Sequence, residues 1–178
     1  MHLETERLIL RPVEESDVPI LHPLIDDADV AATMLSTPHP YPEHEFRAFI
    51  RSARESLERR ERYEMAIVLK ETGLPVGAIR LFNIAWEHSR AETGCWLGKK
   101  YWGNGYVTEA TLRVVRFGFE ELGLEGIHAH CLVENKASAR VLEKAGLLLE
   151  GKIRHAVKKG DEFQDVLLFG IIREDFDR

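Results

Sequence analysis

The chain has 178 residues, of which 44% are hydrophobic and 30% charged, and this suits one soluble globular domain with a sizeable core. Its net charge of −6 disfavours general nucleic-acid binding, which requires a basic face, and no apolar run approaches a membrane span. The first residues, MHLETERLILRP, are mixed and charged rather than a signal peptide. We therefore expect a cytoplasmic protein that is one domain over residues 1–178, without nucleic-acid or membrane partners.

Hydrophobic patterning predicts four segments in the first third of the chain. Apolar residues recur at helical spacing from Phe46 to Leu57 with charges between them, which indicates an amphipathic helix. Three prolines before it, between residues 37 and 42, remove backbone donors and predict a loop. The expected order is a strand at 7–11, a short helix at 15–24, this loop, and the long helix to about residue 60.

The remaining two thirds alternate between strand and helix patterns. Strands are expected at 65–70, 75–82, 91–97, 127–133, 148–155 and 163–172, and helices at 107–122 and 138–145. This order predicts an α/β fold with a mixed central sheet of about seven strands and helices on both faces.

Two glycines, Gly103 and Gly105, stand between the strand that ends near Leu97 and the helix that starts near Tyr106. Glycines let an anion approach the backbone, and the first turn of a helix offers unpaired N–H groups and a partial positive charge. A plain strand-to-helix turn is the more common explanation of such a pair when it stands alone. A dinucleotide fingerprint would require glycine where Thr108 stands, and no Walker-type Gly-Lys-Ser/Thr follows.

Four stretches in order resemble the GCN5-related N-acetyltransferases, and most closely their branch of ribosomal-protein N-terminal acetyltransferases. AETGCWL at 91–97 and GNGYVTEA at 103–110 are similar to the family's central strand and acyl-CoA loop. TERLILRP at 5–12 resembles its first strand, and the segment from Asn135 to Gly146 resembles its second signature. The resemblance therefore extends over nearly the whole chain.

The resemblance implies acetyl-CoA as co-substrate, no metal, and a central strand pair that splays to admit the pantetheine arm. Backbone N–H groups of Trp96 and Leu97 would pair with that arm. A side chain at Gly105 would obstruct the pyrophosphate with little effect on the fold. The residues expected at the pyrophosphate are Gly103, Asn104, Gly105, Tyr106, Val107 and Thr108.

The family's broad pattern has Gln or Arg where Trp102 stands, and Gly or Ala where Val107 stands. These departures keep a second reading open, in which the chain is a non-catalytic acyl-CoA-binding sensor or interaction module. The first reading is an acetyl-CoA-dependent N-acetyltransferase that acts directly on a primary amine. That acceptor would be a protein N-terminal α-amine or a small molecule, and a homodimer is compatible with the family.

Three polar residues are the catalytic and cofactor-contact candidates that the resemblance implies. Glu92 would be the base, although it also fits a solvated strand-end charge. Ser138 would protonate the departing thiolate, or simply pack in the first helical turn. Asn135 precedes a helical run, so it suits an N-cap, and the resemblance also makes it a contact to pantetheine or acceptor.

His128 and His130 alternate along one predicted strand, so both point to one face and Cys131 to the other. Because no carboxylate lies at ligand spacing in the sequence, a solvent-facing or packed pair is favoured over a metal site. Cys95 and Cys131 are far apart in the sequence, in two predicted strands, and are expected to be reduced core thiols.

Overall fold

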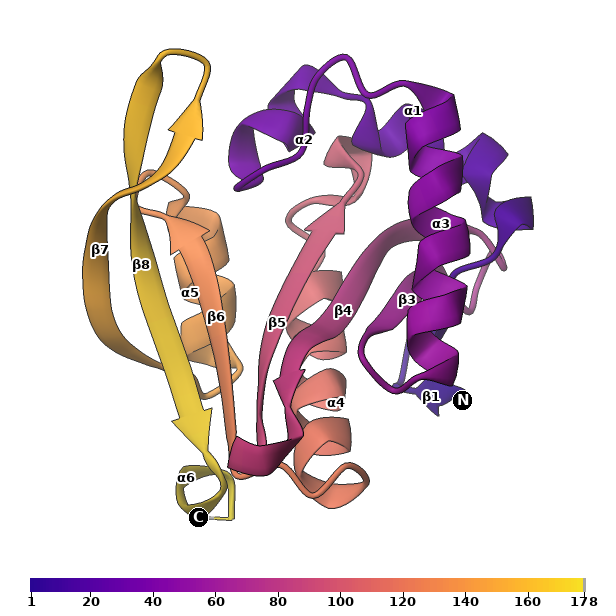
Figure 1. Cartoon of the computed structure of the whole chain (residues 1–178). Helices are drawn as coiled ribbons and strands as arrows, with labels where there is room; N and C mark the ends of the chain where they lie inside the picture. The colour runs from indigo at the N-terminus through magenta and orange to yellow at the C-terminus, as the bar shows by residue number, and fades with distance from the viewer. Residues whose placement is uncertain (178) are drawn as a thin grey trace.

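A computed structural model describes residues 1–177 and shows one mixed sheet of eight strands with helices on both faces (Figure 1). The strand order is β1-β2-β3-β4-β5-β6-β8-β7. The strands are β1 (Leu3–Glu4), β2 (Leu8–Pro12), β3 (Tyr63–Leu69), β4 (Pro75–Ala85), β5 (Arg90–Leu97), β6 (Gly126–Leu132), β7 (Leu148–Lys159) and β8 (Glu162–Ile172). The helices are α1 (Val18–Ile25), α2 (Ala28–Thr33), α3 (Glu43–Glu58), α4 (Tyr106–Glu120), α5 (Lys136–Lys144) and α6 (Arg173–Phe176).

The β5–β6 pair is parallel and short, whereas the other neighbouring strands pair antiparallel. Only Arg90–Glu92 of β5 pair with Gly126–His128 of β6. Beyond Glu92 the two strands diverge, as the centre of Figure 1 shows. This confirms the splayed central pair that the resemblance implied.

Each face of the sheet has its own hydrophobic core. Ile67 and Ile79 pack with Val114 of α4 on one face, while Ala66 and Ala78 pack with the α1 and α3 side chains on the other. All seven residues of β3 are buried because both of its faces are covered.

The predicted α/β class and the order of the main elements are confirmed, with differences at short elements. The sheet has eight strands rather than about seven, because the two-residue β1 is too short for a periodic signal. The expected helix at 15–24 is a 3₁₀ turn, Glu15–Asp17, followed by α1. Neither α2 nor α6 was expected, and α2 is fixed by Asp27, whose carboxylate accepts the Asp29 and Val30 N–H groups. Within residues 1–177, no helix is long and apolar enough to cross a membrane.

Candidate functional site

The two glycines of the turn before α4 have left-handed backbone angles, with φ of +79° at Gly103 and +78° at Gly105. Gly105 is the N-cap of α4 and has no side chain to bond the first-turn N–H groups. Those donors and the positive end of the helix dipole thus stay available to an anion. The expectation that valine at Gly105 would spare the fold is wrong, because a β-branched residue at this φ is strained.

The N-terminal segment holds this loop in place. Glu109 accepts hydrogen bonds from Thr5 Oγ1 (2.5 Å) and from the Arg7 Nε (2.7 Å). Arg7 Nη1 also donates to the Asn104 carbonyl (2.9 Å), and its guanidinium lies 4.7 Å from the centre of the Tyr106 ring. Burial would raise the pKa of Glu109, but the hydrogen bonds from Thr5 and Arg7 lower it overall. Sequence stretches about a hundred residues apart thus come together at the turn that starts α4.

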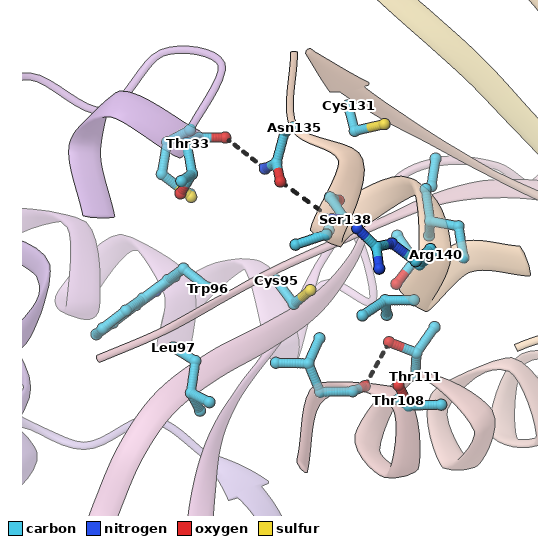
Figure 2. A pocket seen from close by; sticks show the side chains of 18 of the residues that line it. Thr33, Cys95, Trp96, Leu97, Thr108, Thr111, Cys131, Asn135, Ser138 and Arg140 are labelled. Carbon is cyan, nitrogen blue, oxygen red and sulfur yellow. Dashed lines mark hydrogen bonds between the residues drawn. The ribbon is translucent and has the colours of Figure 1, made fainter. Parts of the chain in front are cut away.

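A cavity of ≈ 500 Å³ lies where β5 and β6 diverge. It connects the α4 N-terminus with the ends of α2 and α5, and Figure 2 shows part of its lining. The predicted residues that line it are Glu92, Trp96, Leu97, Gly103, Gly105, Tyr106, Val107, Thr108, Asn135 and Ser138. Asn104 is not in this lining, because its side chain turns back and donates to the Tyr101 and Trp102 carbonyls.

Backbone N–H groups of β5 face the gap between β5 and β6. They are those of Leu97, as expected, and of Cys95 in place of Trp96. The Gly98 N–H donates to the Val76 carbonyl of the neighbouring chain segment at 2.9 Å. Because backbone groups alternate sides along a strand, the Trp96 N–H also faces β4, and those of Leu97 and Cys95 face the gap. The Trp102 indole donates to the Leu97 carbonyl at 2.7 Å, so it stabilises the turn instead of contacting an anion.

Both cysteines are free, as expected, and both line the cavity rather than only the core. Burial raises the pKa of the Cys95 thiol to about 11. Burial also raises the pKa of Cys131, and a hydrogen bond with Ser138 offsets only part of this effect. Thiols in this state contain little thiolate at neutral pH and are poor nucleophiles.

Glu92 lies among hydrogen-bonding partners rather than at a solvated strand end. Its Oε1 is 2.8 Å from His130 Nδ1, and its Oε2 accepts from Asn83 Nδ2 at 3.0 Å. His128 Nε2 lies 3.7 Å from Oε2, and the Glu92 side chain is only 12% exposed. Burial lowers the pKa of His128, which favours its neutral form.

The two histidines share a face, as predicted, and a carboxylate lies close to them in space, although none stands at ligand spacing in the sequence. One potential ligand atom each from Glu92, His128 and His130 lie within 4.8 Å of one another. The carboxylate comes from the neighbouring strand, since Glu92 is in register with His128. Spacing within one strand could not reveal it.

Asn135 is the N-cap of α5, as the sequence predicted. Its Oδ1 accepts the Ser138 N–H at 3.0 Å, and its Nδ2 donates to the Thr33 carbonyl at 3.2 Å (Figure 2). Asn135 therefore joins the start of α5 to the end of α2 across the cavity. Ser138 lines the cavity beside Cys131.

The lining residues that sequence reasoning missed include Arg80 and Phe82 of β4, and Arg140 and Lys144 of α5. The α5 pair lies inside the second signature, so the motif itself could have indicated it. Arg80 and Phe82 lie in a strand that carries no recognised motif, and only the register of β4 with β5 brings them to the cavity.

A splayed parallel strand pair, an uncapped helix N-terminus and a hydrogen-bonded carboxylate in one cavity define an acyl-CoA-type transferase site. The chain matches the acetyltransferase (GNAT) domain over residues 7–148 and belongs to this family. It is 30% identical to the "Uncharacterized N-acetyltransferase p20" of Bacillus licheniformis over 98% of this chain and 97% of that one. It is an N-acetyltransferase.

Two further similarities concern proteins whose acceptors differ. The chain is 23% identical to the spermidine N(1)-acetyltransferase of Escherichia coli K12, over 94% of this chain and 87% of that one. It superposes with a TM-score of 0.89 on RimL, a ribosomal L7/L12 alpha-N-protein acetyltransferase solved with coenzyme A, at 20% identity over 97% and 98% of the two chains. The second similarity shows the common fold.

Proposed function

We propose that residues 1–178 are one catalytic domain that transfers the acetyl group of acetyl-CoA directly to a primary amine. The acceptor is a protein N-terminal α-amine or a small-molecule amine, the two kinds named for the similar proteins above. The observation that carries this proposal is the cavity at the β5–β6 divergence, which joins the α4 N-terminus to the Glu92 cluster.

The α4 half of the cavity supports cofactor binding. The left-handed Gly103 and Gly105 and the first turn of α4, including Thr108, would cradle the pyrophosphate. The Leu97 and Cys95 amides face the gap where the pantetheine amides would lie. Arg140 and Lys144 of α5 add positive charge to the same cavity and suit the remaining phosphate of CoA.

The chemistry would take place beside Glu92. The amine nitrogen attacks the thioester carbon, the C–S bond breaks, and the electron pair leaves on sulfur. Glu92, oriented by His130 and Asn83, would accept the amine proton directly or through one water. The Ser138 hydroxyl would donate a proton to the CoA thiolate and regain one from solvent.

Direct transfer is favoured over an acetyl-enzyme intermediate. The only thiols of the cavity lining are Cys95 and Cys131, and burial raises the pKa of both. Among residues 1–177, no histidine lowers the pKa of either thiol, and His130 Nδ1 is engaged by Glu92. The attacking nucleophile is therefore the acceptor amine itself.

The test is thiol release from acetyl-CoA with a panel of primary amines, with the N-acetylated product identified by mass spectrometry. Turnover that depends on the amine is expected, and intact-mass spectra of the enzyme should show no acetyl adduct. CoA binding without turnover on any amine would favour the non-catalytic module. An adduct on Cys95 or Cys131 would overturn direct transfer.

A further inference from the structure

The acceptor side of the cavity is the sheet face away from α4. Ala78 packs with α1 and α3, and side chains alternate along β4, so Arg80 and Phe82 share its face. In the β4–β5 register Phe82 is opposite Glu92, and Arg80 is opposite Gly94, one two-residue step further along β5. Arg80 therefore lies beside the candidate base and on the face opposite the helix that would hold the pyrophosphate.

The Arg80 guanidinium is held in place by a ring contact and makes no side-chain hydrogen bond within residues 1–177. It stacks on the Phe82 ring, 4.2 Å from the ring centre. Within the described residues its only acidic neighbour across the strand is Glu64, which attracts it electrostatically but lies beyond hydrogen-bond and ion-pair distance. Gly94 opposite it carries no side chain that could cover it. A planar guanidinium that is already oriented and has free N–H donors is well suited to bind a carboxylate with two hydrogen bonds.

The charges of the whole lining agree with this assignment. Its charged side chains within the described part of the chain are Arg80, Glu92, Arg140 and Lys144, so Glu92 is the single acid among them. Glu92 is already engaged by His130 and Asn83. A polyamine, with several cationic nitrogens, would meet one engaged carboxylate and an unpaired arginine.

We infer that Arg80 binds a carboxylate of the acceptor, so that the preferred substrates are amines that also carry a carboxylate. This rests on the N-acetyltransferase function proposed above. The amine would lie at Glu92 and the carboxylate at Arg80, about 7 Å away along the strand. Acidic amino acids and peptides with an acidic residue near the N-terminus both have this chemistry.

The test compares acceptors that differ by a single carboxylate: glutamic acid α-amide with glutamine α-amide, and a short C-terminally amidated peptide beginning Ser-Asp with its Ser-Asn analogue, with spermidine as a third arm. For the wild-type enzyme we expect kcat/KM at least about tenfold higher for the acid of a pair than for its amide, because a hydrogen-bonded ion pair is lost. The pair with the larger preference identifies the source of the carboxylate.

Arg80→Gln should reduce the acid-to-amide ratio of kcat/KM to near one with the acetyl-CoA KM unchanged, and Arg80→Lys should retain part of the preference. Arg54→Gln, on the exposed outer surface of α3, is the matched control and should leave the ratio as in the wild type. The ratio is compared within each variant, so a general loss of fold cannot imitate the result.

Turnover that favours amides or spermidine, or a ratio unaffected in folded Arg80→Gln, would overturn the carboxylate subsite while N-acetyl transfer stands. Absence of turnover with every amine would instead contradict the proposed function.

Discussion

The two sides of the central cavity differ in how completely their polar groups are satisfied. On the α4 side Glu109 is bonded to Thr5 and Arg7, and the Asn104 carbonyl accepts from Arg7. On the opposite face of the sheet, the Arg80 side chain donates no hydrogen bond within residues 1–177, and next to it, outside the cavity lining, Glu64 Oε2 and two nitrogens of Arg62 are buried without a hydrogen-bond partner. On the α4 side the same is true of one nitrogen, Arg113 Nη1. In the function proposed above, the cofactor side is held in place by hydrogen bonds within the protein, while Arg80 on the acceptor side keeps its donors for a substrate.

The largest effect is expected where the two sides meet, at Glu92. Glu92→Gln keeps the shape but removes the base, and kcat should fall by about 10²–10⁴. The acid limb of the pH profile at saturating acetyl-CoA should also be lost. Glu58→Gln, an exposed change on α3, is the control. Wild-type turnover with an unchanged acid limb would remove Glu92 from the mechanism.

CoA binding on the proposed cofactor side can be tested by adding a negative charge, which does not strain the backbone as valine at Gly105 would. Thr108→Glu adds an acid in the first turn of α4, which suits the helix dipole but repels a pyrophosphate. We expect CoA affinity, measured by calorimetry, to fall roughly 10- to 100-fold with little change in Tm. Ser52→Glu, on the exposed surface of α3, adds the same charge away from the cavity and should bind CoA normally. If folded Thr108→Glu binds CoA like the control, the pyrophosphate lies elsewhere.

The buried Glu64, the cross-strand neighbour of Arg80, should make the free energy of unfolding depend on pH. Burial raises the pKa of Glu64 to about 7, from 4.5, despite the nearby Arg80 and Arg62. The folded state therefore binds more protons than the unfolded state between these values. Its stability is greatest below pH 4.5 on this account and falls as pH rises through about 7.

Glu64→Gln should thus flatten the slope, and be more stable than wild type at pH 8 by on the order of 2 kcal/mol. Urea denaturation at pH 5, 6.5 and 8 measures this difference. Glu58→Gln serves again as the exposed control, and parallel slopes for wild type and Glu64→Gln would contradict the prediction.

The smallest effect is expected at Asn135, which belongs to both sides. Asn135→Ala loses the α5 cap and the bond to Thr33, at a cost of about 1 kcal/mol or slightly more. Asn135→Ser restores the cap but not the bond to Thr33, so it should recover most of the Tm. Turnover that recovers in parallel with Tm would reduce Asn135 to a cap, and turnover that stays low would support a role at the acceptor side.

The sequence could predict the local features of the site, but not those that depend on neighbouring strands. The turn before α4 could be predicted because its backbone angles favour glycine at Gly103 and Gly105, and a helix pattern follows them. Asn135 was readable as a cap for the same local reason. Arg80, His130 and Glu92 come together only through register between β4, β5 and β6, and neighbours across strands leave no spacing in one sequence.

Lys159, at the tip of the β7–β8 hairpin, has its ammonium group bound to the carbonyls of Ala31, Ala32 and Met34 at 2.8, 3.0 and 2.8 Å. One cation from a distant hairpin thus completes the C-terminal end of α2, a helix too short to be stable alone. Because Asn135 donates to the Thr33 carbonyl, each carbonyl from Ala31 to Met34 accepts a hydrogen bond from either Lys159 or Asn135. Fraying of the last turn of α2 would therefore break hydrogen bonds to two distant parts of the chain, the start of α5 and the β7–β8 hairpin, so the position of this short helix depends on both.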